Sequence, residues 1–411
     1  MHVLLINQFY PPDPAPTGQL LSHLARALAE RGHGVRVICS AQRYGGVSAQ
    51  GAADFDSASA KPSRIGDVVV TRVAGFGFGR RSKLGRVLDY ASFYVVALFH
   101  ALVTPRPEVV VMLTTPPYIG FIGTVLRFLR GCKFVQWVMD LYPDAMVAHG
   151  MLSRNGWLTR VLMLLTRVML RSADAIWALG PCARRKIAPY LRSRQLDRVL
   201  IVPPWGSPSL GPWQGNRNDL RAELGCDGRF VAMYSGNMGL GHDFETFLKG
   251  AQQLPDVLFL FVGGGPRAPE VRRSAIQHGL MNLTFRDYVP KERMSESLST
   301  GDVHILSQLP AWQGCIVPSK LAGIFAVGRP AVFVGGEDNE IAHWIREADA
   351  GFVVPIGDST AFVRAVESLQ GDCSLRDRLS RNARSFYLRS LSPDVNLPKL
   401  VGSIEKLGNG R

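Results

Sequence analysis

The sequence holds 411 residues, which is more than one ordinary hydrophobic core supports, so we expect two domains. Hydrophobic residues make up 46% of the chain and charged residues 19%, and this composition excludes a disordered protein. The net charge of +14 indicates an anionic partner: nucleic acid, an anionic membrane surface or a phosphorylated substrate.

The cysteines and the apolar runs point to a cytoplasmic protein. The six cysteines lie far apart without a CxxC pair, which favours reduced thiols over a disulfide or zinc framework. The opening stretch, MHVLLINQFYPP, has too short an apolar run for a signal peptide. No stretch reaches the ~18 to 20 apolar residues of a spanning helix. We therefore expect no membrane span, while binding at a membrane surface stays possible.

The first half of the chain alternates strands and helices. Residues 3–6 form a short apolar run typical of a buried parallel strand. A Pro-rich loop leads into a helix with leucines on one face, and residues 35–39 form the next strand, so this opening predicts a βαβ unit. Further strands are expected at residues 68–73, 109–113, 133–139 and 175–179.

A second alternation begins after a loop-forming stretch at residues 201–208, Ile-Val-Pro-Pro-Trp-Gly-Ser-Pro. Its strands are expected at residues 230–234, 257–262, 283–285, 303–306, 331–334 and 351–354. We therefore predict two doubly wound, Rossmann-like α/β domains, at residues 1–203 and 204–385. A final helical segment, about residues 386–411, is expected to pack back on the first domain. Ligands of such folds bind beyond the carboxyl ends of the strands, which predicts a site in a cleft between the domains.

The glycine-rich segment at residues 235–242, SGNMGLGH, joins a predicted strand to a predicted helix. Glycines let the backbone approach a phosphate, and the helix N-terminus offers free N–H groups. The alternative is a tight turn without a ligand, with an exposed loop histidine. A second run, Gly263 to Gly265, follows another strand, and a flexible connection is an equally good interpretation. The candidate donor-binding residues here are Gly236, Asn237, Gly239, Gly241, His242 and Gly264.

Ser319 and Lys320 open the segment PSKLAGIFAVGRP. Ser319 is expected to cap a helix while its hydroxyl and the first amides point into the cleft, and Lys320 adds a cation. A diphosphate held in this way needs no metal ion. The alternative is an ordinary helix cap beside a solvated lysine.

Polar residues of the first domain supply candidates for the acceptor side. Asp140 ends a predicted strand and could orient an acceptor hydroxyl or act as a base. Gly18 would allow the backbone to approach the reacting centre, unless Thr17 only caps a helix there. Tyr10 and His149 are further acceptor-binding candidates, although a lone histidine is more often structural.

Arginines alternate with apolar residues in several predicted helices of the first domain. Arg154, Arg160, Arg167 and Arg171 surround the helix WLTRVLMLLTRVMLR. Such interleaving suits an anionic membrane surface, and the alternative is a buried helix whose arginines reach to solvent. The other members are Phe76, Phe78, Arg80, Arg81, Lys83, Arg86, Arg127, Phe128, Arg130, Lys133, Trp157, Leu162 and Met163. Nucleic acid is disfavoured because no known binding module is present.

Several segments resemble glycosyltransferase family 4, of the GT-B fold. The resemblance rests on INQFYPPDPAPTGQLLSHLARALAERGHGVRVIC, VQWVMDLYPDAMVAHGML, YSGNMGLGHDFETFLKGA, LFLFVGGGP and PSKLAGIFAVGRP, and it covers nearly the whole chain. The last four are similar to the subgroup that assembles O-antigen, colanic acid and capsule.

The resemblance implies a nucleotide-sugar donor, UDP-linked in many relatives, held by the C-terminal domain. It also implies a glycan acceptor, often on polyprenyl diphosphate at the inner face of the cytoplasmic membrane. Transfer would proceed with retention of anomeric configuration and no obligatory metal or other cofactor.

The sequence departs from the wider family where that family carries two glutamates. Alignment on Gly328 to Pro330 places Cys315 and Gly323 at those positions. Glu337 and Glu340 lie downstream and could face the donor, with a solvated loop as the alternative. Two other hypotheses stay open. An epimerase or hydrolase on the same fold would need no lipid acceptor but would require a carboxylate pair near the sugar, which the sequence does not clearly display. The missing glutamates motivate the other, an inactive membrane-associated partner subunit.

Overall fold

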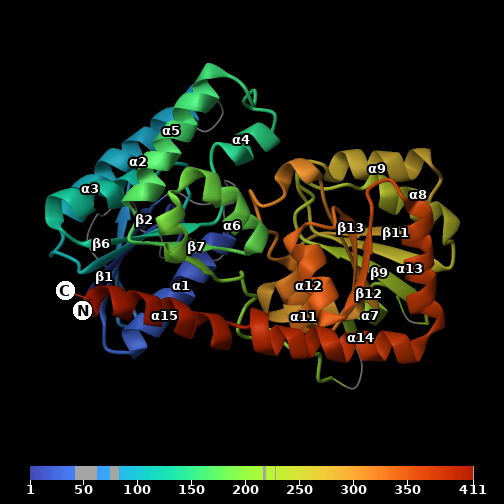
Figure 1. Ribbon diagram of the computed structural model, residues 1–411. Coiled ribbons are helices and arrows are strands. Elements are labelled where there is room, and N and C mark those ends of the chain that lie inside the picture. The colour runs from blue at the N-terminus through green and yellow to red at the C-terminus, as the bar shows by residue number, and fades with distance from the viewer. Residues whose placement is uncertain (42–62, 75–82, 216–218, 227, 411) are drawn as a thin grey trace. The chain divides into compact units, whose positions relative to one another are not determined.

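The computed structural model describes residues 1–41, 63–74, 83–215, 219–226 and 228–410. The chain divides into two compact units. The first comprises Met1–Val147, Leu152–Val202 and Leu397–Arg411, and the second comprises Ala148–Met151 and Pro203–Asn396. Each unit is built on one sheet with helices packed against it (Figure 1).

The sheet of the first unit contains eight strands among the described residues, in the order β3-β4-β2-β1-β5-β6-β7-β8. These strands are β1 His2–Ile6, β2 Gly34–Ser40, β3 Ser63–Ile65, β4 Val68–Val73, β5 Val109–Met112, β6 Lys133–Val138, β7 Ala175–Ala178 and β8 Val199–Ile201. Neighbouring strands are parallel except β3, which pairs antiparallel with β4. The sequence pattern did not predict β3 and β8. The three residues of β3 are exposed and give no apolar signal, and Ile201 was assigned to the linker.

The helices of the first unit alternate with its strands along the chain. They are α1 Pro16–Glu30, α2 Lys83–Val103, α3 Phe121–Arg130, α4 Asp144–Ala148, α5 Trp157–Ser172 and α6 Pro181–Ile187. Figure 1 shows α2, α3 and α5 together on one side of the first unit. Among the described residues, no helix combines the length and apolar character required to cross a bilayer.

The last helix, α15 Pro393–Asn409, contains Pro398 and ends on the first unit. The Trp177 indole N–H donates to the Ser403 hydroxyl at 3.2 Å. Glu405 lies 3.1 Å from the His33 ring and 3.3 Å from the Arg31 guanidinium. These contacts fix the end of the chain against β7 and the turn after α1.

The second unit has a parallel sheet in the order β11-β10-β9-β12-β13-β14. These strands are β9 Phe230–Ser235, β10 Val257–Val262, β11 Leu283–Arg286, β12 Val303–Gln308, β13 Ala331–Gly335 and β14 Gly351–Val354. The helices are α7 Asp219–Glu223, α8 Glu245–Gln253, α9 Ala268–Gln277, α10 Met294–Thr300, α11 Lys320–Ala326, α12 Glu340–Ala348, α13 Ser359–Gly371 and α14 Cys373–Phe386. A π-helical turn, Tyr387–Leu391, follows α14.

The core of the second unit follows the two-residue period of its strands. Phe259 and Phe261 of β10 enter a cluster with Phe247 and Phe362, whereas Leu258 and Leu260 face a smaller cluster on the other side of the sheet. Both faces of this sheet are therefore buried, which is why its strands read as continuous apolar runs.

Two predicted helix caps are wrong. Helix α1 begins at Pro16 with Ala15 in the N-cap position, so Thr17 lies inside the first turn. Proline supplies the helical φ at this position and has no N–H to satisfy. Ser319 occupies the N-cap of α11 but has helical dihedrals, and its side chain accepts no hydrogen bond from the helix. Its hydroxyl is therefore not used in capping.

Candidate functional site

A polar cluster of the second unit surrounds the ammonium group of Lys320. The Nζ atom donates to the Tyr234 hydroxyl and to the Asn237 carbonyl, the latter at 3.0 Å, and it lies 4.0 Å from the centre of the Tyr234 ring. Desolvation lowers the pKa of Lys320 to about 7. A nearby anion would favour the charged form, so the cluster is suited to a negatively charged ligand.

His242 lies beside this lysine in a defined tautomer. Its Nδ1 atom is hydrogen-bonded to the Ser307 carbonyl, and because a carbonyl only accepts, Nδ1 carries the proton. The Nε2 lone pair then faces the Lys320 ammonium at 3.5 Å. Desolvation, followed by the neighbouring Lys320 charge, lowers the pKa of His242 to about 3. His242, which the sequence places among the residues that bind the sugar donor, is therefore a neutral imidazole whose Nε2 atom accepts a hydrogen bond from Lys320 and orients it.

Two glycine loops at the carboxyl ends of β9 and β10 fit closely against each other. Gly236, Gly263 and Gly265 have φ of 112°, 126° and 130°, a region that favours glycine. A Cβ on Gly265 would lie 2.3 Å from the Asn237 amide oxygen, and one on Gly263 would lie 2.5 Å from the Gly236 carbonyl. A Cβ on Gly236 would come within 3.1 Å of the Lys320 side chain. These glycines keep the loops in contact and hold the backbone next to Lys320.

The remaining glycines of these loops differ in the space around them. A Cβ on Gly241 would meet the Trp312 ring at 2.8 Å, and one on Gly239 would meet the Asn237 amide nitrogen at 3.3 Å. Gly264 has more room, because its Cβ would be 3.6 Å from the Tyr288 ring. The structure brings Gly236, Asn237, His242 and Lys320 into one cluster. Gly239 belongs to the loop after β9, and Gly264 belongs to the loop after β10.

A second polar cluster lies at the carboxyl ends of β5 and β6 in the first unit, around Asp140. The Thr114 hydroxyl accepts from the Asp140 and Met139 amides at 2.9 and 3.2 Å, which ties the two strand ends together. Loss of water around the carboxyl group raises the pKa of Asp140 to about 6, against the opposing hydrogen bond from Tyr142. This carboxyl has the acidity of a general base that works near neutral pH.

Tyrosines and helix α5 complete the surroundings of Asp140. A small cavity is lined by Asp140, Thr114, Tyr118, Tyr142 and Thr166. The Thr166 hydroxyl of α5 donates to the Tyr142 carbonyl at 2.8 Å, and the Tyr118 hydroxyl donates to the Leu162 carbonyl at 3.4 Å. Helix α5 is therefore fixed directly to the loop that carries Asp140.

The other residues predicted near the acceptor lie in two places. Gly18 is buried, and a Cβ there would lie 3.0 Å from the Phe9 carbonyl, so packing against the loop after β1 requires a glycine. Thr17 is half-buried, and its hydroxyl lies 3.5 Å from the Asn7 amide nitrogen. Tyr10 is buried, and burial raises the pKa of its hydroxyl to about 12. Their roles toward an acceptor stay predictions.

His149 lies outside the first unit in the division of the chain. It belongs to Ala148–Met151, and its ring meets the Trp312 ring edge-on at 4.2 Å between centres. Desolvation lowers the pKa of His149. Asp144, the second acid of the DLYPD segment, is the first residue of α4 and accepts from the Tyr190 hydroxyl.

The positions of the missing glutamates hold small buried residues. Cys315 is 3% exposed, and Gly323 lies buried in α11. Of the two downstream acids, Glu337 is exposed and pairs with Arg346 at 3.5 Å, as a solvated loop predicts. Glu340 is instead buried in the first turn of α12, so the solvated-loop alternative is wrong for this residue.

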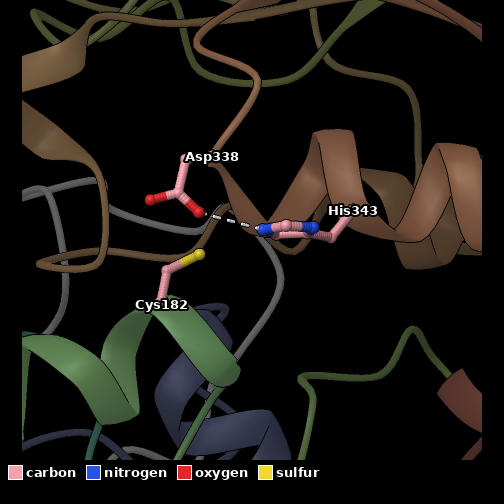
Figure 2. Close-up of side chains that lie close together, drawn as sticks. All are labelled: Cys182, Asp338 and His343. Atoms are coloured by element: carbon pink, nitrogen blue, oxygen red, sulfur yellow. Dashed lines mark hydrogen bonds and ion pairs between the residues drawn. The ribbon is translucent and has the colours of Figure 1, made fainter.

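The loop before α12 also carries an exposed acid–histidine pair. Figure 2 shows the Asp338 carboxylate beside the His343 ring, with 3.2 Å between Oδ1 and Nε2. Cys182, which is drawn in the same view, belongs to the first unit, where its sulfur accepts from Arg185.

Sequence reasoning missed the tyrosines of both clusters. Tyr234 lies within the apolar run of β9, where an aromatic residue indicates the hydrophobic core. The side chain is fully buried, and its hydroxyl also accepts from the Lys320 ammonium group. Tyr142 stands two residues after Asp140 in the segment DLYPD. The usable signal was a hydroxyl-bearing aromatic at or just beyond the carboxyl end of a buried strand.

The two α/β units have the architecture of the GT-B fold of glycosyltransferases. Solved structures with this architecture include sucrose-phosphate synthase from Thermosynechococcus elongatus, at TM-score 0.78, 14% identity and 100% coverage of both chains. Anabaena HepE in complex with UDP and glucose matches at TM-score 0.73 and 12% identity, over 99% of this chain and 100% of that one.

The chain belongs to the family 4-type glycosyltransferases: residues 17–205 match the glycosyl transferase 4-like domain, and residues 223–372 match the glycosyl transferases group 1 domain. The resemblance and the fold predicted from the sequence are confirmed.

Two curated relatives span most of the chain. A putative colanic acid biosynthesis glycosyl transferase, WcaI of Escherichia coli (strain K12), is 24% identical over 98% of this chain and 100% of its own length. The probable glycosyltransferase WbjE of Pseudomonas aeruginosa is 24% identical over 80% of this chain and 83% of its own length.

Proposed function

We propose that this glycosyltransferase moves a sugar from a nucleotide-sugar, with UDP as the nucleotide, to a lipid-linked saccharide during surface polysaccharide assembly. Anomeric configuration is retained in this proposal. The single observation that carries it is the Lys320 cluster, where a desolvated cation lies against the glycine loops at the carboxyl ends of two strands. The relative named for colanic acid biosynthesis supports the polysaccharide role.

The donor diphosphate is proposed to bind at Lys320. Its Nζ atom is oriented by Tyr234, Asn237 and His242, so a phosphate oxygen would meet a cation already held in place. The glycine backbone beside it allows close approach of the ligand. The Ser319 hydroxyl, which caps no helix, is a further donor to a phosphate oxygen. Neutralisation by ammonium, hydroxyl and amide groups requires no metal ion.

The acceptor is proposed to bind in the first unit, with its hydroxyl at Asp140. A carboxyl group with a pKa of about 6 is ionised at neutral pH and can still take a proton. The Tyr142 hydroxyl holds it, and the neighbouring tyrosine rings offer the flat apolar faces on which sugars stack.

The lipid of the acceptor is proposed to lie in the cytoplasmic membrane, with the protein bound to the anionic inner face of that membrane. Helices α2, α3 and α5 carry several exposed large apolar side chains, which form the exposed apolar helix surface, and such groups of exposed apolar residues mark interaction sites. Its members are Val95, Phe99, Val103, Phe128, Leu129, Trp157, Leu158, Val161, Leu164, Leu165 and Val168. Exposed Arg154 and Arg160 add positive charge beside it. Because α5 also binds the Asp140 loop, a lipid on this surface would deliver its sugar to Asp140.

Not every arginine of the predicted membrane surface is available to lipids. Arg127 pairs with Asp174 at 2.9 Å, Arg130 donates to the carbonyls of Leu102 and Thr104, and Arg171 donates to the Tyr190 carbonyl. Phe76, Phe78, Arg80 and Arg81 lie outside the described residues, as do the side chains of Lys83 and Arg86. The apolar side chains therefore carry more of this proposal than the sequence suggested.

The donor proposal is tested by thermal stabilisation of the purified protein with UDP, GDP, CDP and ADP, with and without magnesium. UDP is expected to raise the melting temperature independently of metal. In Lys320→Ala, UDP affinity should fall about 10- to 100-fold, the effect of losing one or two charge-assisted hydrogen bonds. Arg364→Ala, which removes an exposed cation of α13, is the matched control. Unchanged UDP affinity in Lys320→Ala would remove Lys320 from the donor site.

The membrane proposal is tested by co-sedimentation with vesicles. The protein should bind vesicles containing phosphatidylglycerol more than neutral ones, and salt should weaken the binding. Trp157→Ser and Phe128→Ser, at residues 76% and 74% exposed, should each reduce partitioning about tenfold or more, from the loss of a large apolar anchor. Ile276→Ser, at a residue 79% exposed on α9, is the control. Equal partitioning of all three variants would overturn the proposed surface.

A further inference from the structure

A separate cavity opens in the second unit at the amino ends of its strands. Its volume is about 630 Å³, and its lining includes Asp302, the residue before β12, and Arg329, two residues before β13. Lys320 lies instead beside the loops at the carboxyl ends of β9 and β10. The strands are parallel and six residues rise about 20 Å, so this cavity is on the opposite edge of the sheet from the Lys320 cluster.

The lining of the cavity carries an excess of positive charge. It includes Arg221, Arg329, Arg381 and Arg384, and Asp302 is the one acid among the lining residues that the structure describes. That acid is already engaged, because its Oδ2 atom accepts from Arg221 at 3.1 Å and from the Val231 amide at 2.8 Å. Arg329, Arg381 and Arg384 form no ion pair with a carboxylate of the lining that the structure describes, so the cavity keeps an excess of positive charge.

Two buried polar atoms of the lining make no hydrogen bond with any residue that the structure describes. Ser299 is 4% exposed, and its hydroxyl has no partner. The Arg329 guanidinium donates from one terminal nitrogen to the Ser299 carbonyl at 2.8 Å, while its Nε atom has no partner. Native proteins rarely leave such groups unsatisfied, so each one calls for a specific explanation. A bound anion would satisfy both.

The electrostatic environment of Arg329 also favours an anion. Desolvation lowers the pKa of its guanidinium, and the positive charges of Arg221 and Arg376 act in the same direction, while Asp302 and Asp377 oppose them. A phosphate group would offset this desolvated charge and accept bidentate hydrogen bonds, the geometry for which arginine is suited.

We propose that this cavity binds a small phosphate monoester, with its phosphate held by Ser299, Arg329 and Arg381 and its organic part against Trp213. The volume lies in the range of small-molecule sites, about 300 to 1,000 Å³, and so leaves room for a sugar or nucleoside beyond the phosphate. Trp213, 40% exposed on the cavity wall, provides an aromatic face for that group. This site is independent of the proposed donor and acceptor sites.

The test is calorimetric titration of the full chain with glucose 6-phosphate, with AMP, and with glucose as the unphosphorylated control. The two phosphate esters distinguish a sugar ligand from a nucleotide ligand. We expect saturable binding of at least one ester, none of glucose, and unchanged affinity in Lys320→Ala. Arg381→Ala and Ser299→Ala should each weaken binding about tenfold, because each removes one hydrogen bond to a charged group. Arg364→Ala, at an exposed arginine outside the cavity, should leave affinity unchanged.

Both cavity variants are chosen so that a loss of binding is not a loss of fold. Arg381 is exposed, and the Ser299 hydroxyl makes no internal hydrogen bond, so the melting temperatures should stay within a few degrees of the parent. Absence of saturable binding by both esters, equal binding of glucose, or parental affinity in both variants would overturn the proposal. Loss of binding only in Lys320→Ala would assign the ligand to the donor site instead and would also overturn it.

Discussion

The Lys320 cluster of the second unit and the Asp140 cluster of the first reach a similar chemical state by opposite routes. Desolvation lowers the pKa of the lysine to about 7 and raises the pKa of the aspartate to about 6. Each group therefore titrates close to neutral pH, where an ordinary lysine or aspartate does not. Shifts of this kind are characteristic of sites that bind charge or transfer protons.

The two clusters differ in what holds them in place. Lys320 is held by the backbone of the first glycine loop, at the Asn237 carbonyl, and by Tyr234, whereas Asp140 is held by side-chain hydroxyls from Thr114 and Tyr142 and by helix α5. A backbone-built site suits a ligand part that never changes, such as a diphosphate. A site built from side chains can instead be altered one residue at a time.

The largest expected effect comes from Asp140→Asn. Loss of a general base should lower kcat/KM by about 10²- to 10⁴-fold, while UDP affinity stays at the parental value. Asp197→Asn, at an exposed acid of the same unit, is the control for the charge change. Parental activity in Asp140→Asn would leave Asp140 as a structural residue and break the comparison.

Stability provides a second readout for the same variant. The folded-state pKa of Asp140 lies above that of the unfolded chain, so the ionised carboxylate reduces stability as the pH rises through about 4 to 6. The neutral amide of Asp140→Asn avoids this loss, and the melting temperature at pH 8 should equal or exceed the parental value. A variant that is more stable but less active separates a functional role from a folding role.

A smaller effect is expected at the glycine loops, where stability is measured by chemical denaturation. Gly265→Ala should destabilise the second unit by about 2 to 4 kcal/mol, because it combines a φ of 130° with overlap against Asn237 and Met238. Gly264→Ala, one residue away, should change stability by less than about 1 kcal/mol, since its Cβ has ordinary contacts. Equal destabilisation by both substitutions would show that the close contact of Gly265 with Asn237 and Met238 does not hold the two glycine loops together.

The strand pattern of the sequence predicted most of both sheets because buried parallel strands read as short apolar runs. Val257 to Val262 is such a run, and it forms β10. The exposed edge strand β3 gave no such signal, since it owes its pairing to its neighbour and not to its own composition. Strand β8 is a short apolar run, but it ends at Ile201, where the sequence pattern predicts the linker. The caps at Thr17 and Ser319 were wrong because residue type alone does not determine the dihedral angles at a helix start.

The candidate site was predictable in its residues but not in its electrostatics. Gly236, His242 and Lys320 lie up to 84 positions apart, yet each follows or precedes a strand end, and the topology of a parallel sheet brings such ends together. The desolvation of Lys320 and the tautomer of His242 depend on contacts with Tyr234 and Ser307 that no local pattern contains. The cavity lined by Ser299 and Arg329 had no sequence signal, because its residues are separated by elements that only the fold places side by side.

The smallest effect expected is the pH dependence of kcat/KM, which reports the two clusters in the free enzyme. Asp140 must be ionised to accept a proton, so the rate should fall below pH 6, approaching tenfold per pH unit. Lys320 must be protonated to bind a diphosphate, so the rate should fall with a similar slope above pH 7. The profile should therefore be a narrow bell centred between these values.

Lys320→Arg tests which group produces the alkaline limb of that bell. A guanidinium remains charged throughout this range, so the fall above pH 7 should disappear, even if the altered geometry lowers the maximum rate. The acid limb should persist in this variant and vanish only in Asp140→Asn. If Lys320→Arg keeps the alkaline limb, another group titrates there, and desolvation of Lys320 serves the fold of the loops and not the charge of the donor site. The two clusters would then differ in purpose as well as in construction, because only the aspartate would be set to respond near neutral pH.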